Sequence, residues 1–193
     1  TLYEGNQEFQ RLDGAADSKL KVIPNGIDIE RFENPKPYDH APTIALIGRV
    51  VPVKDVKSFI RATALLKEHL PDLKALVIGP ADEDEDYAEE CVELVKHYRL
   101  EETLNFTGKV DVRDYFGRMD INVLTSISEA QPLVILEAGA AGIPSVATDV
   151  GACREMIMGK KDDNFGAGGA VVPPSDVPAM AAALYKMLND KDE

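Results

Sequence analysis

The sequence predicts an α/β protein with a doubly wound, six-stranded parallel sheet of Rossmann-like type. From Thr43 onward, short β-rich runs alternate with stretches of helical spacing, which is typical of a parallel sheet with helices on both faces. Several runs, such as TIALIG at 43–48, are apolar without alternation, as expected of strands that are buried on both sides. The chain has 193 residues, 45% of them hydrophobic, which suffices for one domain of this size.

The predicted elements follow one another along the chain in the order that a parallel sheet requires. The first helix of this series follows the first strand, and a helix closes the chain. The six strands are predicted at 43–48, 74–79, 104–108, 120–125, 144–148 and 169–172. The helices are predicted at 55–69, 86–99, 112–118, 132–141, 151–158 and 176–189.

The first forty residues differ in character from the rest. Residues 1–21 are polar and of mixed charge, and the run VIPNGIDIERF at 22–32 contains the turn dipeptide Asn25-Gly26. A proline-spaced segment, NPKPYDHAP, follows at 34–42. We therefore interpret residues 1–40 as a connector.

Charge excludes several classes of partner. The chain has 21 Lys and Arg against 34 Asp and Glu, for a net charge of −13, which repels nucleic acid and anionic membranes at long range. A small phosphorylated ligand is still allowed, because local cations and a helix N-terminus can hold it. The acidic run at 82–86 lacks the glycine of a calcium loop and is expected to begin a helix.

Other features argue against metal sites and membrane segments. Cys91 and Cys153 form no CxxC motif and have no histidine at ligand spacing, so we expect two idle thiols. The histidines are scattered and receive no catalytic role; they are His40, His69 and His97. No window approaches about 18 apolar residues and the opening residues do not resemble a signal peptide, so we expect no membrane span and a cytoplasmic location.

Ligands of open parallel sheets bind beyond the carboxyl ends of the strands. At the first of these ends the sequence reads GRVVPVKD, which lacks the GxGxxG of dinucleotide enzymes. It instead offers two cations, Arg49 and Lys54, which suit a diphosphate. Ordinary surface ion pairs, worth about 0 to 1 kcal/mol, are the alternative.

Two carboxylates stand near a predicted helix in SEAQPLVILEAGAAG at 128–142. Pro132 suits the first helical position, which places Glu129 in the preceding loop and Glu137 inside the helix. A carboxylate buried among apolar residues needs hydrogen-bond donors, and a sugar diol supplies two charge-assisted bonds of about 1.5 to 3 kcal/mol each. Free N–H groups around Ala130, Gln131 and Leu133 are expected to meet phosphate or sugar oxygens. Solvent-facing carboxylates are the alternative.

These motifs resemble a known family. The pattern GR-x4-K, followed by E-x7-E from Glu129 to Glu137, resembles the nucleotide-sugar half of family 4 retaining glycosyltransferases. The wording VIPNGID, GRVVPVKD, EAQPLVILEA and VGACREM looks specifically similar to the Pel exopolysaccharide type. The resemblance extends from about Val22 to Asn189.

The resemblance implies the C-terminal half of a GT-B fold and a role for each motif. It implies that Arg49 and Lys54 neutralise the donor diphosphate without a metal ion or other cofactor. Glu137 would bind the ribose hydroxyls, and Glu129 would contact the transferred hexose beside the scissile bond. Two further contacts are implied: Val110 would meet the base through its backbone, and Leu133 would pack near the nucleoside. The implied donor is a UDP-sugar, with UDP-glucose favoured.

The sequence departs from the family pattern in two ways, one at the donor site and one in its domain organisation. Ala130-Gln131-Pro132 replaces the usual glycine-rich spelling, and the N-terminal acceptor domain is missing. We therefore expect residues 1–40 to be a linker and a remnant of the connection to that domain, residues 41–193 to be the donor-binding domain, and the isolated chain to be inactive.

Several other functions stay open at this point. A nucleotide-sugar epimerase and a glycogen synthase-like GT-B enzyme are the nearest alternatives, because both would use the same kind of donor site. A non-catalytic nucleotide-sugar-sensing module and a purely structural interaction domain belong to different classes. The nucleotide that the chain binds, and whether it binds one at all, would separate them.

Overall fold

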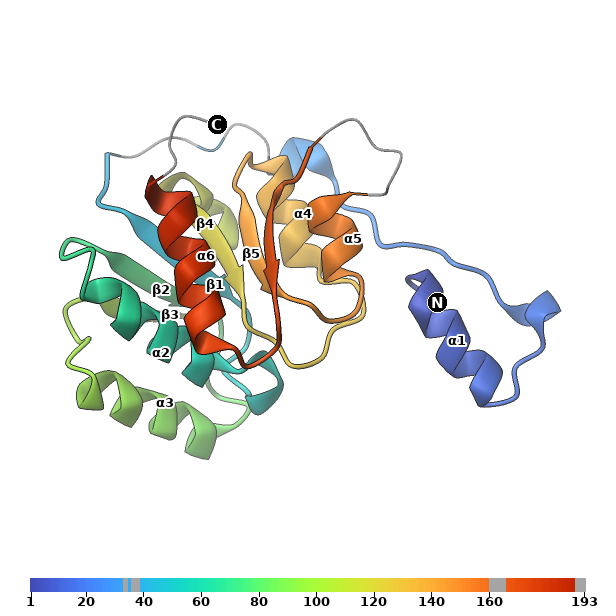
Figure 1. The fold of residues 1–193 in the computed structure, drawn as a ribbon, viewed down its shortest axis with the longest axis horizontal. Helices are drawn as coiled ribbons and strands as arrows, with labels where there is room; N and C mark the ends of the chain where they lie inside the picture. Colours follow the sequence, from blue (N-terminus) through green and yellow to red (C-terminus); the bar gives the residue numbers. More distant parts are fainter. Residues whose placement is uncertain (33–34, 36–38, 160–165, 190–193) are drawn as a thin grey trace.

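The fold was analysed in a computed structural model, which describes residues 1–32, 35, 39–159 and 166–189. One sheet of six strands, all parallel, has the order β3-β2-β1-β4-β5-β6 (Figure 1). Each predicted strand is confirmed to within one residue at either end. The strands are β1 (Thr43–Ile47), β2 (Lys74–Ile78), β3 (Leu104–Gly108), β4 (Ile121–Leu124), β5 (Ser145–Thr148) and β6 (Gly169–Val172).

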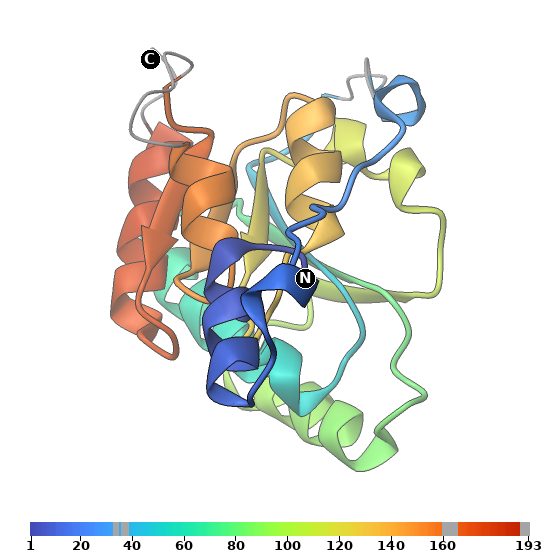
Figure 2. The same ribbon diagram turned by 90° about the vertical axis from the view of Figure 1, so that its right-hand side faces the viewer.

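Helices cover both faces of the sheet, as the doubly wound prediction requires (Figures 1 and 2). Side chains of α2, α3 and α6 share one buried cluster with the strands, whereas α4 and α5 pack on the opposite face. Neighbouring strand residues divide between the faces, because Ile44 faces the α2 side and Ala45 the α4 side. The helices are α1 (Glu4–Leu12), α2 (Val56–Lys67), α3 (Glu85–His97), α4 (Leu133–Ala140), α5 (Cys153–Met158) and α6 (Val177–Asn189).

The acidic run after β2 begins a helix, as expected. The Asp84 side chain accepts a hydrogen bond from the N–H of Tyr87 at 3.0 Å and caps α3. Glu85 and Asp86 occupy the first turn of this helix, where carboxylates interact favourably with the helix dipole. The run is thus explained by local helix formation.

One predicted helix is not formed, and the ends of the other predicted helices differ from the structure by at most two residues. The predicted helix at 112–118 is two 3-10 turns, η4 (Val112–Asp114) and η5 (Phe116–Arg118). Asp111 caps the first turn by accepting from the N–H of Arg113, and Phe116 turns into the core to meet Phe32. The helix predicted from Pro132 begins one residue later, at Leu133, with Pro132 as its N-cap.

The N-terminal segment contains structure that its polar composition does not predict. Helix α1 lies beside the α/β core and has no buried residue (Figure 1). Beyond it, two 3-10 turns, η1 (Asp17–Lys19) and η2 (Ile29–Arg31), interrupt an otherwise irregular path. Within the proline-spaced segment at 34–42, residues 34 and 36–38 lie outside the described residues. The interpretation of residues 1–40 as a connector stays a prediction, and residues 1–32 of this connector contain a short helix and two 3-10 turns.

Candidate functional site

The strand order identifies where a ligand would bind. From β1 the chain proceeds outward to β2 and β3, then returns to β4 on the other side of β1. In open α/β sheets the ligand crevice lies beyond the carboxyl ends of the strands at such a reversal. The loops after β1 and β4 therefore define the candidate site, and they contain Lys54 and Glu129 respectively.

Lys54 and Glu129 meet at this reversal point. Lys54 ends a 3-10 turn, η3 (Pro52–Lys54), and its Nζ lies 2.5 Å from Oε1 of Glu129. Both side chains are largely withdrawn from water, with exposures of 20% for Lys54 and 13% for Glu129. The hydroxyl of Ser126 donates to the same carboxylate oxygen at 2.7 Å. The carboxylate is thus held in one orientation by a cation and a hydroxyl.

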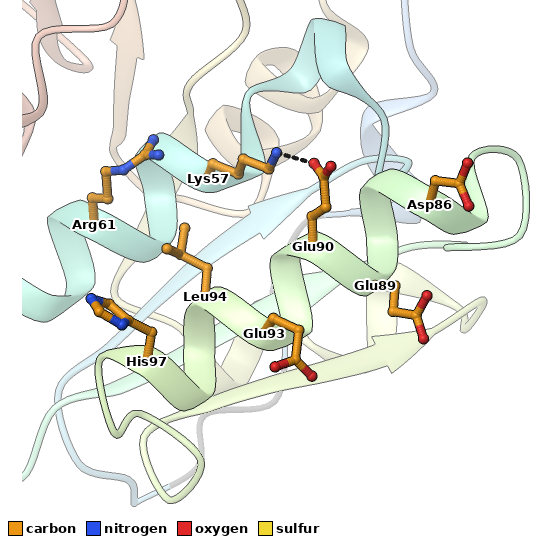
Figure 3. A pocket seen from close by; sticks show the side chains of 8 residues that line it. All are labelled: Lys57, Arg61, Asp86, Glu89, Glu90, Glu93, Leu94 and His97. Atoms are coloured by element: carbon orange, nitrogen blue, oxygen red, sulfur yellow. Dashed lines mark hydrogen bonds and ion pairs between the residues drawn. The ribbon is translucent and has the colours of Figure 1, made fainter.

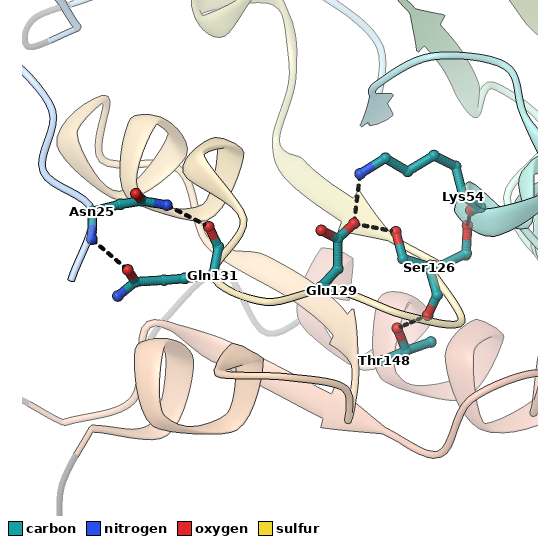
Figure 4. Close-up of polar contacts among 7 residues, drawn as sticks. Asn25, Lys54, Ser126, Glu129, Gln131 and Thr148 are labelled. Carbon is teal, nitrogen blue, oxygen red and sulfur yellow. Dashed lines mark hydrogen bonds and ion pairs between the residues drawn. The ribbon is translucent and has the colours of Figure 1, made fainter. Parts of the chain in front are cut away.

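Buried hydroxyl groups fix the two loops to each other and to the end of β5 (Figure 4). The Thr125 hydroxyl donates to the carbonyl oxygen of Lys54 at 2.8 Å, and the Thr148 hydroxyl donates to the carbonyl oxygen of Ser126 at 2.6 Å. The N–H of Ile127 also donates to the carbonyl of Val53 at 3.0 Å. The Lys54–Glu129 pair is therefore built on a rigid backbone.

The sequence analysis did not identify these supporting hydroxyls. Thr125 and Ser126 follow β4 directly, and Thr148 ends β5. All three are buried polar residues at the predicted ligand edge. Their position at strand ends was the signal that could have identified them.

A close backbone approach braces the loop after β4. Gly151 has φ +56, and a Cβ atom there would lie 2.3 Å from the carbonyl oxygen of Glu129 and 2.6 Å from that of Ala130. The adjacent N–H of Ala152 donates to the Ala130 carbonyl at 2.9 Å. The segment after β5 therefore packs against the backbone of Glu129 and Ala130. Only glycine at position 151 allows so close an approach of the two backbones.

The start of α4 provides amide donors beside the ion pair. Pro132, the N-cap, has no side-chain cap bond. Within the described chain, the amides of Ala130, Gln131 and Leu133 donate no hydrogen bond to protein groups. Unpaired amides at a helix start attract anions.

Glu137 lies one turn into α4, about 6 Å along the axis from Leu133. Its side chain is half-buried, and burial raises the pKa of its carboxyl group. The positive charge of Arg31 opposes this shift. Among the described residues, none forms a hydrogen bond or ion pair with the side-chain carboxylate of Glu137. This carboxylate therefore lacks the donors that a sugar diol would supply.

The structure places Arg49 differently from Lys54. Its guanidinium contacts both carboxylate oxygens of Glu83 at 2.5 Å, and exposures are 51% for Arg49 and 52% for Glu83. Of the two predicted cations, Lys54 alone is in contact with Glu129. Arg49 would have to release Glu83 to reach a ligand that lies between the strand ends.

The remaining predicted residues line the outer rim. Val110 follows β3 and is 40% exposed, and Leu133 in the first turn of α4 is 45% exposed. Gln131 turns its side chain toward the connector, where it accepts a hydrogen bond from the N–H of Asn25. These positions leave Val110 and Leu133 available to a ligand.

Thiol and metal chemistry receive no support within the described residues. Cys91 and Cys153 are both buried and free, as the sequence indicated. Burial, with a smaller effect of the Glu129 charge, raises the pKa of Cys153 to about 12. No group of three or more His, Cys, Asp or Glu in the described part of the chain could hold a metal ion. No helix there is long and apolar enough to cross a bilayer.

A groove of about 770 Å³ lies between α2 and α3 (Figure 3). Its four carboxylates outnumber its two permanent cations, so the lining has a net negative charge; the charged residues are Asp86, Glu89, Glu90 and Glu93 against Lys57 and Arg61. Such a surface repels phosphate, whereas the reversal point combines a cation with open amides. We therefore favour the reversal point as the functional site.

Comparison with known proteins places the chain in a family. Residues 41–190 match the family described as "Glycosyl transferases group 1". The phosphatidyl-myo-inositol mannosyltransferase of Mycolicibacterium smegmatis is 32% identical over 91% of this chain and 45% of its own length. The D-inositol 3-phosphate glycosyltransferase of Kineococcus radiotolerans is 29% identical over 95% of this chain and 47% of its own length. The chain thus spans about half the length of the curated relatives it matches.

Solved structures have the same fold. Anabaena Alr3699/HepE in complex with UDP superimposes with a TM-score of 0.84 at 24% identity, over 96% of this chain and 52% of that one. The C-terminal domain of a glycosyl transferase group 1 family protein (LpcC) from Francisella tularensis gives 0.68 at 26% identity, over 86% of this chain and 94% of that domain. The chain has the Rossmann-like architecture of one half of a GT-B fold, and it belongs to the glycosyl transferases group 1 family.

Proposed function

We propose that this chain is the donor-binding domain of a family 4 retaining glycosyltransferase that moves a hexose from a nucleoside diphosphate sugar, with UDP-glucose as the preferred donor. The observation that carries the proposal is the Lys54–Glu129 pair, which lies at the strand reversal beside the unpaired amides of α4. The acceptor would be a growing exopolysaccharide, following the resemblance to the Pel type.

Each site residue has a definite part in this proposal. Lys54 and the start of α4 bind the diphosphate and stabilise the negative charge that develops on it as the sugar leaves. Arg49 joins them after it releases Glu83, which costs little because the pair is exposed. No metal ion takes part. Glu129 contacts the hexose beside the bond that breaks.

The nucleoside occupies the rim of the same site. The ribose hydroxyls donate to the Glu137 carboxylate, which accepts no hydrogen bond from the described part of the chain. Val110 meets the base through its backbone, and Leu133 packs against the nucleoside. Because the chain spans about half of its relatives, an acceptor domain would complete the enzyme, and this chain alone would bind the donor without transferring sugar.

A glycogen synthase-like activity is the second candidate. The glycogen synthase of Mycobacterium tuberculosis is 29% identical over 96% of this chain. An enzyme of that kind with ADP-glucose as its donor would bind ADP more tightly than UDP. An epimerase would share the UDP site but act on the sugar without an acceptor, and a sensing module would bind the nucleotide tightly and belong to a protein without activity.

Titration of the chain with UDP, ADP and GDP, observed by protein NMR, tests the proposal. We expect UDP to bind most tightly and to shift resonances of Arg49, Lys54 and 129–137. Preference for ADP would favour the glycogen synthase-like alternative. Absence of binding by all three, or shifts confined to the groove between α2 and α3, would refute the donor-site assignment.

A further inference from the structure

The connector is tied to the candidate site by Asn25. The backbone N–H of Asn25 donates to Oε1 of Gln131 at 2.5 Å, and the Asn25 side-chain amide donates to the carbonyl oxygen of Gln131 at 2.9 Å (Figure 4). Asn25 is half-buried between the exposed residues Pro24 and Gly26. One residue of the connector thus provides a hydrogen-bond donor to the side-chain oxygen of Gln131 and another to its carbonyl oxygen.

Gln131 belongs to the loop that presents the unpaired amides. This loop is held at its beginning by Lys54 and Ser126, which fix Glu129, and in its middle by Ala152, which binds the carbonyl of Ala130. Its last peptide, before the N-cap Pro132, has no side-chain cap within α4. Asn25 supplies the missing support at this end of the loop.

The two bonds fix the orientation of a peptide whose neighbours face the ligand. A peptide unit turns as one plane, so a fixed Gln131 carbonyl limits rotation of the adjoining backbone. The free amides of Gln131 and Leu133 lie on either side of Pro132, which itself has no N–H group. Preorganised donors bind an anion better than donors that must first be ordered.

We propose that Asn25 is a positioning residue for the donor site, which holds the Gln131 peptide so that the amides around the start of α4 face the diphosphate. This inference rests on the proposed function. It makes the affinity for the nucleoside diphosphate depend on whether the connector is docked. Movement of residues 22–32 away from α4 would then weaken donor binding without changing any residue that touches the donor.

The test compares two ligands that differ only in the diphosphate. In the whole 193-residue chain, Asn25→Ala should weaken UDP binding by about five-fold, as expected for loss of one neutral hydrogen bond, and should leave the affinity for uridine unchanged. The matched control, Asn6→Ala, changes the same residue type in α1 and should alter neither. NMR titration measures both affinities, and circular dichroism measures the midpoint of thermal unfolding.

Gln131→Ala provides a second, independent variant. It removes the acceptor of the Asn25 backbone N–H and should produce the same selective loss of UDP affinity. It also decides the matter if Asn25→Ala does not fold. An equal loss of UDP and uridine binding in either variant would indicate general destabilisation and would overturn the inference.

The failure of this inference differs from the failure of the proposed function. Wild-type binding of UDP together with unchanged UDP affinity in both variants would overturn the positioning role alone. A wild-type chain that binds no nucleoside diphosphate would overturn the proposed function, and the positioning role with it.

Discussion

The loop after β1 contributes two cations to two different kinds of ion pair. Lys54 pairs with Glu129 in a setting where both side chains are mostly withdrawn from water and where Ser126 shares the carboxylate. Arg49, five residues earlier, pairs with Glu83 where both groups are about half exposed. The first pair is anchored by buried hydroxyls at strand ends, whereas the second lies on the surface.

The difference indicates which cation is permanent and which is recruited. A partly buried pair is costly to break, because the remaining charge loses its partner in a poorly solvated place. An exposed pair contributes about 0 to 1 kcal/mol and is readily exchanged for a ligand. We therefore interpret Lys54 as a fixed part of the site and Arg49 as a cation that becomes available when a diphosphate arrives.

The largest effect is expected from Lys54→Ala. In an enzyme that combines this domain with an acceptor domain, turnover should fall by about 100-fold or more, which corresponds to roughly 3 kcal/mol of lost transition-state stabilisation. The free energy of unfolding should fall less, by about 1 to 2 kcal/mol, because Ser126 still donates to Glu129. Steady-state kinetics and chemical denaturation measure the two quantities.

Lys186→Ala is the matched control for this change. Lys186 is exposed in the last turn of α6, so its loss should leave both turnover and stability near the wild-type values. Equal losses of stability and transition-state stabilisation in Lys54→Ala would instead make the buried pair a purely structural feature.

Glu137→Gln should have an intermediate effect, of opposite sign on binding and on stability. The affinity for UDP should fall by about ten-fold, because two charge-assisted hydrogen bonds become neutral ones. Thermal stability near neutral pH should rise. Burial raises the pKa of Glu137 in the folded chain, so its contribution to stability is present below the unfolded pKa and is lost as the pH rises through the folded pKa.

The comparison of Glu137→Gln with wild type is best followed through pH. The stability difference between the two chains should be greatest near pH 7 and should vanish toward about pH 3, where the carboxyl group is protonated in both states. A variant that is less stable than wild type at neutral pH would show that the carboxylate has an internal partner.

The smallest effect is expected from Arg49→Ala. The affinity for UDP should fall by about three-fold, while the free energy of unfolding should change by less than about 0.5 kcal/mol, because the lost pair is exposed. Calorimetric titration and denaturation test this. If Arg49→Ala lost as much UDP affinity as Lys54→Ala does in the same titration, the distinction between a fixed and a recruited cation would be removed.

Glu83→Gln tests the role of the Arg49–Glu83 ion pair by changing the carboxylate instead of the cation. It frees Arg49 without removing it, so the affinity for UDP should stay at the wild-type value or rise by at most about two-fold. Weaker binding in this variant would mean that Glu83 holds Arg49 in its working position.

The sheet could be predicted from the sequence because its signals are local. Runs such as TIALIG are apolar throughout and end at Gly48, and every strand boundary fell within one residue. The failure at 112–118 has a physical reason. Asp111 closes a single turn, and packing of Phe116 against Phe32 then takes the chain out of helical geometry.

Contacts within the site could be predicted only between residues that follow the ends of neighbouring strands. Lys54 and Glu129 follow β1 and β4, which are neighbours in the sheet, so their meeting follows from the strand order. The same reasoning applied to β1 and β2 would have placed Arg49 near Glu83. The contact of Asn25 with Gln131 spans 106 residues, and no periodicity or motif encodes such a pairing.

The glycine at position 151 divides the site into positions that can change during evolution and positions that cannot. Its neighbouring carbonyl groups leave no room for any side chain, so a library randomised at this residue should return glycine almost exclusively. Val110 and Leu133, which project outward at the rim, face no such restriction. Attempts to redirect the proposed donor site toward another nucleotide should therefore begin at those two positions.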